Sequence, residues 1–269
     1  MPILDPGRFN RPGPGVAKDA PPKKGLARFF EIMGRDFFDL FKLNLLVLLC
    51  LFPALLAVSL FALADVKPLI WLAVAWVLLI PAGPAVAAMN KLTLNMVRDI
   101  PCFQWEVFKK AYKQNAKQGI AAILLFGFFF LGLGVAAMDW LMQPEKNYVM
   151  LAIIAMALYT VTSIFTFTFS QIPVVDLRFG AIVKNAVLLT LGRANRGVPA
   201  VLIQLLVLGA LIAFLPLSGF IFLFGVFSIL NLTANLWVWP ALQLVLRDDA
   251  QAPDEAALAQ NTEPRDTQE

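Results

Sequence analysis

Apolar residues in this chain cluster in six long runs that short polar segments separate. The runs cover about residues 44–64, 68–89, 119–141, 148–175, 198–215 and 218–246. Crossing the roughly 30 Å hydrocarbon core of a bilayer takes about 20 residues of helix, so each run is long enough to span it. Lipid offers the peptide backbone no hydrogen-bonding partner, so such runs must be helical. The pattern predicts an all-α membrane protein with six transmembrane helices.

A different period precedes the first run. Between residues 26 and 43, Phe30, Met33, Phe37 and Phe41 lie three to four positions apart, with charged residues between them. This spacing predicts an N-terminal amphipathic helix. Two compatible roles fit it: the helix lies in the headgroup layer of the membrane, or its apolar face packs against the bundle.

The segment 81–119 starts within the second run and continues as a basic helix before the chain re-enters lipid. Trp105, Phe108 and Tyr112 share one face of this predicted elbow helix, and lysines, including Lys113, occupy another. The helix either floats on anionic lipid or forms a docking surface for a partner, with these four residues as contacts. A weaker version of the segment returns at 170–197 and predicts a second cytoplasmic elbow.

Each even-numbered run carries proline towards its later end. Pro81 and Pro84 lie in the second run, Pro173 in the fourth and Pro240 in the sixth. Proline removes a backbone hydrogen bond and clashes with the preceding turn, so we expect these helices to bend or break. Parallel repeats and simple convergence explain the recurrence about equally well.

Composition and charge set the class and the orientation. Hydrophobic residues make up 59% of the chain and charged residues 15%, too few charges for a soluble domain of this size. Lys and Arg gather before the first run, between the second and third, between the fourth and fifth, and in the tail, whereas the opposite side holds only Lys67 and Lys146. This bias predicts that both termini lie in the cytoplasm. The net charge of +4 is therefore a topology signal, and no nucleic-acid partner is expected.

The two ends of the chain differ from the membrane domain, which we place at 26–246. Residues 1–25 form a cytoplasmic segment rich in proline and glycine, which argues against helix or strand. Residues 247–269 are polar and acidic and lack aromatic residues, so we expect a disordered tail.

Few residues offer catalytic chemistry. The chain contains no histidine, the commonest metal ligand and the usual proton carrier near neutral pH. Cys50 and Cys102 lie on different segments without metal-like spacing, which favours unpaired structural thiols. No ionisable residue lies at the centre of a run. We therefore expect no enzyme activity, cofactor or metal.

Neutral polar residues do occur within the fourth and sixth runs. The candidates are Thr162, Thr166, Ser228, Asn231 and Asn235. Hydroxyl and amide groups in lipid seek partners on neighbouring helices, so hydrogen bonds between helices are one interpretation. The other is a polar intramembrane groove that holds an uncharged solute such as a sugar.

The segment GPAVAAMNKLTLNMVRD, followed by FQWEVFKKAYKQNAKQG, resembles the signature of the YesL-like family, bacterial membrane proteins that contain a domain of unknown function. Residues 27–53 and 10–25 are similar to the corresponding parts of that family, and the likeness is strongest in the first half of the chain. The resemblance implies a multi-pass protein of the bacterial cytoplasmic membrane, often encoded beside carbohydrate ABC importers. No catalytic residue is assigned to the family.

Three hypotheses follow. The first is an accessory membrane subunit of a carbohydrate (oligosaccharide) ABC importer, with the lipid bilayer and the ABC permease subunits as partners. The second is a self-standing channel or carrier for an uncharged solute. The third, an enzyme acting on lipid or glycan, ranks lowest, because the sequence offers no paired carboxylates and no serine-centred elbow. A second copy of the chain is a further candidate partner.

Overall fold

The computed structural model describes residues 23, 25–61, 68–214 and 219–261, with the backbone alone for 61, 68, 69, 71, 194, 196, 219, 220 and 244–261. Ten helices lie in this part of the chain, and it contains no strand, so the all-α prediction is confirmed. They are α1 (Leu26–Phe61), α2 (Pro68–Val77), α3 (Ala82–Val97), α4 (Gln104–Gln114), α5 (Ala116–Met142), α6 (Tyr148–Gln171), α7 (Phe179–Gly192), α8 (Ala194–Ala213), α9 (Gly219–Leu223) and α10 (Val226–Asn261). The predicted segment 1–25 lies almost wholly outside the described residues.

Several helices have the length and composition of membrane spans. Among the described residues, Leu26–Leu60, α5 and α6 qualify, and α7 with the part of α8 from Gly197 onwards would add a fourth span bent by 97°. Only 17–28% of their most apolar windows is buried within the protein. Apolar surface on this scale is that of a membrane-embedded protein. Six crossings remain a prediction.

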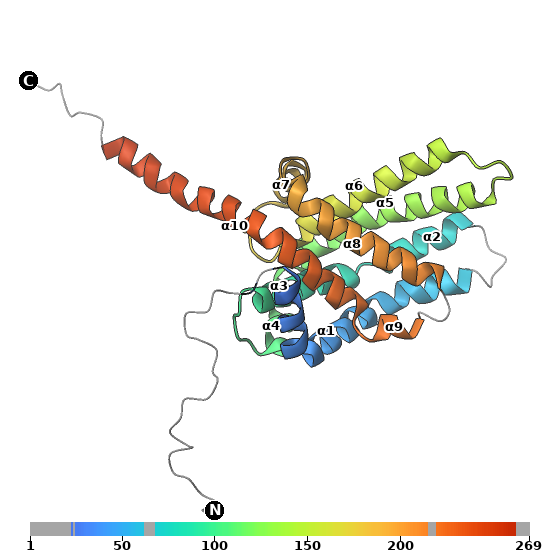
Figure 1. The fold of residues 1–269 in the computed structure, drawn as a ribbon, viewed down its shortest axis with the longest axis horizontal. Helices are drawn as coiled ribbons and strands as arrows, with labels where there is room; N and C mark the ends of the chain where they lie inside the picture. Colours follow the sequence, from blue (N-terminus) through green and yellow to red (C-terminus); the bar gives the residue numbers. More distant parts are fainter. Residues whose placement is uncertain (1–22, 24, 62–67, 215–218, 262–269) are drawn as a thin grey trace, which may run out of the picture.

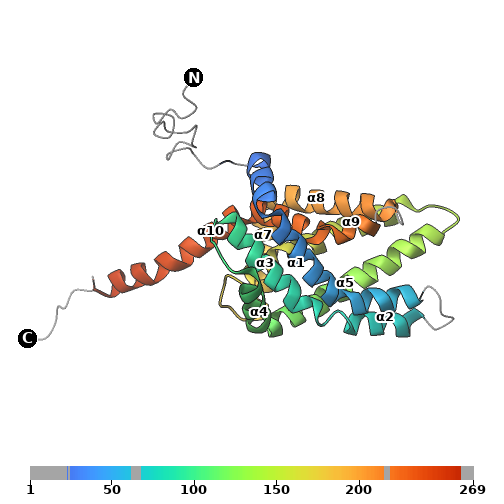
Figure 2. The same cartoon turned by 90° about the horizontal axis from the view of Figure 1, so that it is seen from below.

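The long apolar helices extend towards one end of the molecule, as Figures 1 and 2 show. The tips of α1, α2, α5, α6 and α8 lie at that end, and α3, α4 and α7 gather at the other. Helix α3 lies at the centre of the fold, and 14 of its 16 residues are buried. It contacts α1, α4, α5, α6 and α10.

The second predicted span, 68–89, is two helices. Helix α2 ends at Val77, a tight turn follows, and α3 starts after Pro81. Proline supplies no backbone N–H and fixes its own φ near the value of a helical first turn, so it suits a helix start better than a helix interior. The prediction that proline interrupts this run is confirmed.

The sixth predicted run, 218–246, is also interrupted. Helix α9 ends at Leu223. Gly225 follows with a φ of 134°, a backbone conformation that residues other than glycine rarely adopt. The buried Asn44 of α1 closes this break: its amide donates to the carbonyls of Phe222 (2.8 Å) and Leu223, and its oxygen accepts from the N–H of Phe227 (3.0 Å). Asn44 thus satisfies backbone groups that the break leaves without helical partners.

Helix α10 runs on to Asn261, into the region from residue 247 onwards where a disordered tail was expected. The stretch DEAALAQN within it contains strong helix formers. The remainder of the expected tail, 262–269, lies outside the described residues.

Candidate functional site

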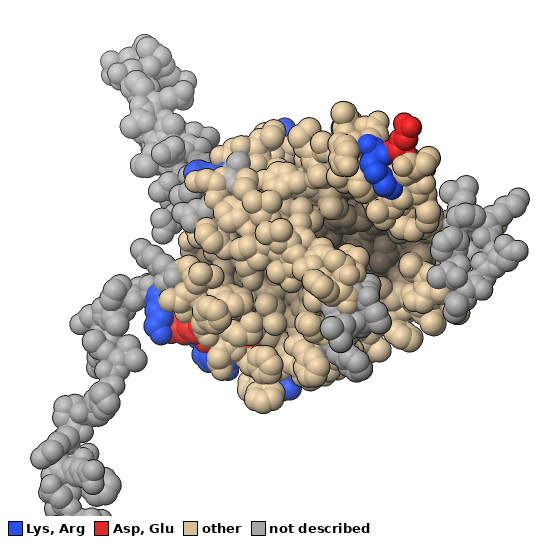
Figure 3. Space-filling view, turned by 45° about the vertical axis from the view of Figure 1, so that its right-hand side comes forward, with Lys and Arg blue, Asp and Glu red and all other residues tan. Residues whose placement is uncertain are grey.

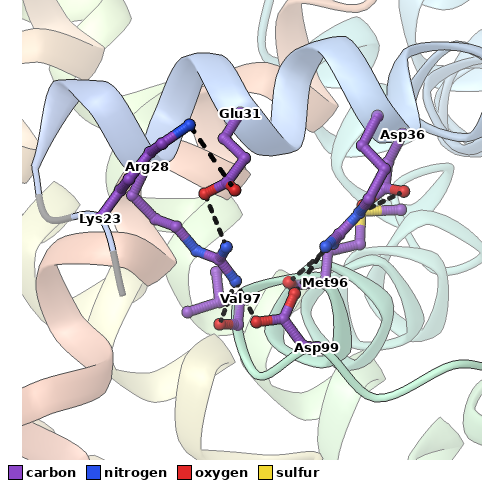
Figure 4. Close-up of polar contacts among 8 residues, drawn as sticks. Lys23, Arg28, Glu31, Asp36, Met96, Val97 and Asp99 are labelled. Atoms are coloured by element: carbon purple, nitrogen blue, oxygen red, sulfur yellow. Dashed lines mark hydrogen bonds and ion pairs between the residues drawn. The ribbon is translucent and has the colours of Figure 1, made fainter. Parts of the chain in front are cut away.

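The first part of α1 docks across the C-terminal end of α3. Asp36 departs from helical geometry (φ −112°, ψ 20°) and separates this part from the rest of α1. Arg28 and Arg35 both reach Asp99, which follows α3, and the Arg35 Nη1–Asp99 Oδ1 distance is 2.6 Å (Figure 4). The same guanidinium groups donate to the carbonyls of Val97 (3.4 Å) and Met96 (3.3 Å). Cations at a helix C-terminus satisfy its free carbonyls and face its negative dipole end.

Asp99 itself ends the helix. Its φ of 55° is left-handed, which aspartate and asparagine tolerate better than other residues that carry a side chain. Burial alone would raise the pKa of this carboxyl, but the hydrogen bonds and charges of Arg35 and Arg28 outweigh it and hold the pKa below its usual range. A depressed carboxyl pKa stabilises the folded state above the unfolded pKa of about 4.

We predict that Asp99→Asn loosens the first part of α1 while α3 still ends correctly, because asparagine keeps the left-handed backbone and removes only the charge. The carboxylate is half exposed, so the expected cost is about 1 kcal/mol or less. Hydrogen exchange at 26–35 should rise in the variant at neutral pH. In the wild type the same rise should occur only as the pH falls below about 4, through the folded pKa. Equal protection of both proteins at pH 7 would contradict the prediction.

A groove lies between α1 and the segment that joins α3 to α4. Two adjoining cavities of about 390 and 470 Å³ form it, and both are lined by Asp39, Cys102 and Gln104. Leu43, Leu46 and Leu92 line its inner part, and the first and last of these are almost fully buried. Carboxylates of Asp36, Asp39 and Glu106 also line it.

Two aromatic side chains stand at the edge of the groove. Phe103 is 82% exposed and Trp105 is 58% exposed, although both belong to residue types that normally bury most of their surface. Ile100, which lines the other cavity, is also exposed. An apolar interior with exposed aromatic edges is a common arrangement of protein-binding grooves.

The four predicted contact residues of α4 divide between its two sides. Phe108 is buried in the main core, and Tyr112 is half buried, with its hydroxyl donating to the carbonyl of Pro81 at 3.2 Å. Trp105 and Lys113 are exposed. The surface that a partner can reach on α4 therefore includes Trp105 and Lys113, whereas Phe108 and Tyr112 hold the helix against α3.

The two asparagines predicted on the sixth run belong to a buried polar cluster. The Asn235 amide donates to Asn231 Oδ1 (2.7 Å), to Thr93 Oγ1 (2.7 Å) and to Asn90 Oδ1 (3.1 Å), while its oxygen accepts from Ser170 (2.7 Å). Thr93 also reaches Asn231 at 2.8 Å. The cluster joins α3, α6 and α10. We did not single out Asn90 and Thr93 from the sequence, although two polar residues three positions apart in an apolar stretch were the available signal.

The other three predicted groove residues lie elsewhere. Thr166 donates to the side chain of Gln204 on α8 at 3.1 Å, and Ser228 donates to the carbonyl of Gly225 at 3.0 Å. Thr162 is buried, and its hydroxyl has no hydrogen-bond partner among the described residues. The structure thus brings Asn231 and Asn235 together and keeps Thr162, Thr166 and Ser228 outside that cluster.

A hollow opens at the end of the molecule where the tips of the long helices lie. Figure 3 shows this hollow, and in that view its described walls consist of residues other than Lys, Arg, Asp and Glu. Such walls can accommodate an uncharged ligand or lipid chains but offer no ionic partner to a charged one.

Comparisons with protein-family models, with curated proteins and with solved structures found no match to this chain. The similarity to the YesL-like family rests on the sequence segments quoted above and stays a prediction.

Proposed function

We propose that this protein is an accessory membrane subunit that holds a segment of a partner membrane protein in the groove between α1 and the α3–α4 connection. The partners we propose are the permease subunits of a carbohydrate ABC importer in the bacterial cytoplasmic membrane. The observation that supports a docking role is the groove itself, with an apolar interior and with Phe103 and Trp105 exposed at its edge. The importer as partner rests on the resemblance alone.

The proposal includes a topology with six crossings and both termini in the cytoplasm. α1, α5, α6 and α8 supply four crossings, and the interrupted pairs α2–α3 and α9–α10 supply the other two. α4 and α7 are then the cytoplasmic elbows. The excess of Lys and Arg around α4 favours a cytoplasmic position for the groove.

The lining of the groove indicates the chemistry of its occupant. Leu43, Leu46 and Leu92 suit the apolar face of a helix, and the carboxylate of Glu106 suits lysine or arginine beside that face. Asp39 is already paired with Lys42, which also lines the groove (Nζ–Oδ1 3.5 Å). An amphipathic helix with basic flanks meets both conditions. The cytoplasmic loops of membrane proteins are rich in lysine and arginine, so a membrane partner can supply such a helix.

The test is recovery of partners from native membranes in mild detergent, followed by mass spectrometry. Wild-type protein is expected to bring two permease subunits with it in near-equal amounts. Truncation of aromatic side chains that a partner buries costs about 2 kcal/mol or more, so Phe103→Ala with Trp105→Ala should lower recovery about 30-fold if the partner covers both rings. Both side chains are exposed, and the variant should fold normally.

The matched control is Phe214→Ala, which removes a 68% exposed aromatic ring at the far end of α8 and should leave recovery unchanged. Recovery of the wild-type protein alone, or an equal loss in the control, would contradict the docking proposal.

The hollow favours a second candidate function, a self-standing channel or carrier for an uncharged solute. Its test is solute flux in liposomes that contain only this protein. Thr162→Val is the informative variant, because it removes a hydroxyl that makes no hydrogen bond within the described structure and so should leave stability intact. Flux that the wild type shows and Thr162→Val loses would support this function, and absence of wild-type flux would exclude it for the solutes tested.

A further inference from the structure

We infer that the outer face of α4, continued by the first turn of α5, binds the phosphate headgroups of anionic phospholipids. Four lysines carry this inference: Lys109, Lys110 and Lys113 on α4, and Lys117 on α5. All four are exposed. At about 100° per residue, the three lysines of α4 fall within an arc of roughly 100° around the helix.

The packing of α4 fixes the direction in which these lysines point. Phe108 and Ala111 are buried on the opposite side of the helix, and the Tyr112 hydroxyl bonds to the carbonyl of Pro81. With that face held against α3, the helix cannot rotate to bring the lysines inwards. They form a fixed array of charges rather than a freely turning one.

These lysines have no acidic partner among the described residues. Three cations elsewhere in the molecule are engaged, in contrast: Arg28 and Arg35 with Asp99, and Lys91 with the carbonyl of Pro173. On α4, the ammonium group of Lys109 makes a cation–π contact, at 5.6 Å from the centre of the Trp105 ring. Glu106 shares the outer face, so four lysines and one glutamate leave a local charge of +3.

The position of this face suits a membrane surface. Lys117 lies in the first turn of α5, whose 27 residues have the composition of a membrane span, so the lysines lie next to the point where the chain enters lipid. Lysines that reach towards lipid phosphates are the usual arrangement on the polar face of an interfacial helix.

The second elbow helix, α7, provides an internal comparison. Its outward residues include Leu188, which is 58% exposed, and Leu191, which is 76% exposed, with Lys184 as the exposed cation of that helix. An outer face with two exposed leucines and one lysine offers few charges to phosphate headgroups. The two elbows therefore differ in what they contact, and the anionic-lipid site belongs to α4.

The experiment uses the purified full-length protein in a neutral detergent, with phosphatidylglycerol and phosphatidylcholine added in equal amounts. Native mass spectrometry counts the lipids that stay bound. Wild-type protein is expected to retain phosphatidylglycerol preferentially. The variant with Lys109, Lys110, Lys113 and Lys117 each changed to Gln should lower this preference by roughly 600-fold, because each of the four lysines near an anionic surface contributes roughly fivefold.

Two controls make the result specific. Lys184→Gln on α7 should leave the preference unchanged, which separates the α4 site from a general effect of charge. Inorganic phosphate added at a large excess should leave bound phosphatidylglycerol in place; displacement by phosphate would identify a general anion site and overturn the lipid assignment. Equal retention of both lipids by the wild type, or an unchanged preference in the four-lysine variant, would also overturn it. No partner protein takes part, so this result is independent of the docking proposal.

Discussion

Gly83→Ala is expected to disrupt the packing of α3 on α5 and to lower the free energy of unfolding by about 3 kcal/mol or more. A Cβ atom at position 83 would lie 2.2 Å from the carbonyl oxygen of Gly119, and one at position 119 would lie 2.9 Å from the backbone of Gly83. Both glycines are buried, and backbone atoms cannot move aside as the end of a side chain can. The helices must separate, and α3 contacts five other helices.

Two other glycines of the bundle serve as graded controls. At Gly127, a Cβ would meet the flexible end of Leu79 at 2.8 Å, so Gly127→Ala should cost less than Gly83→Ala. At Gly132 nothing lies within 4 Å, so Gly132→Ala should be neutral or stabilise α5 by up to about 1 kcal/mol through helix propensity. Thermal unfolding in detergent measures all three, and similar midpoints for Gly83→Ala and Gly132→Ala would contradict the proposed close contact.

The helical class of this protein could be predicted from the sequence, because hydrophobic runs in lipid allow few other backbones. The central position of α3 could not. Its sequence, AGPAVAAMNKLTLNMV, is less apolar than the spans around it, and its start was predicted as the end of one of them. Burial of α3 depends on how closely its small side chains let neighbouring helices approach. That is a property of pairs such as Gly83 and Gly119, which lie far apart in the sequence.

The candidate site was predictable to a similar degree. Helical spacing placed Trp105, Phe108 and Tyr112 on one face of α4, but spacing does not tell whether a face meets solvent, lipid or protein. In the structure Phe108 is buried in the core with residues of α3, whereas Trp105 is exposed. Arg28, Arg35 and Asp99 were equally hard to connect, because ions 64 and 71 positions apart carry no local pattern.

Asn235→Leu is expected to destabilise the junction of α3, α6 and α10 by about 2 kcal/mol. Leucine has the same number of side-chain heavy atoms in the same branched arrangement, so the main change is the loss of the hydrogen-bonding groups. The Asn235 amide has two hydrogens for three acceptors, and its oxygen accepts one bond from Ser170, so about three bonds form at once. Hydrogen bonds between membrane helices contribute roughly 0.6 kcal/mol each, and the loss also leaves buried partners without a bond.

Thr162→Val is the matched control, since it removes a buried hydroxyl that has no partner among the described residues, and it should be neutral or stabilising. The free energies of unfolding of Asn235→Leu and Thr162→Val in detergent distinguish loss of the polar cluster from the general effect of replacing a polar side chain by an apolar one.

The double variant Asn235→Leu with Ser170→Ala should cost less than the sum of the two single changes, because the 2.7 Å contact between these side chains is removed only once. Additive costs would show that the two helices are held together by apolar packing, and that Asn235 serves another purpose.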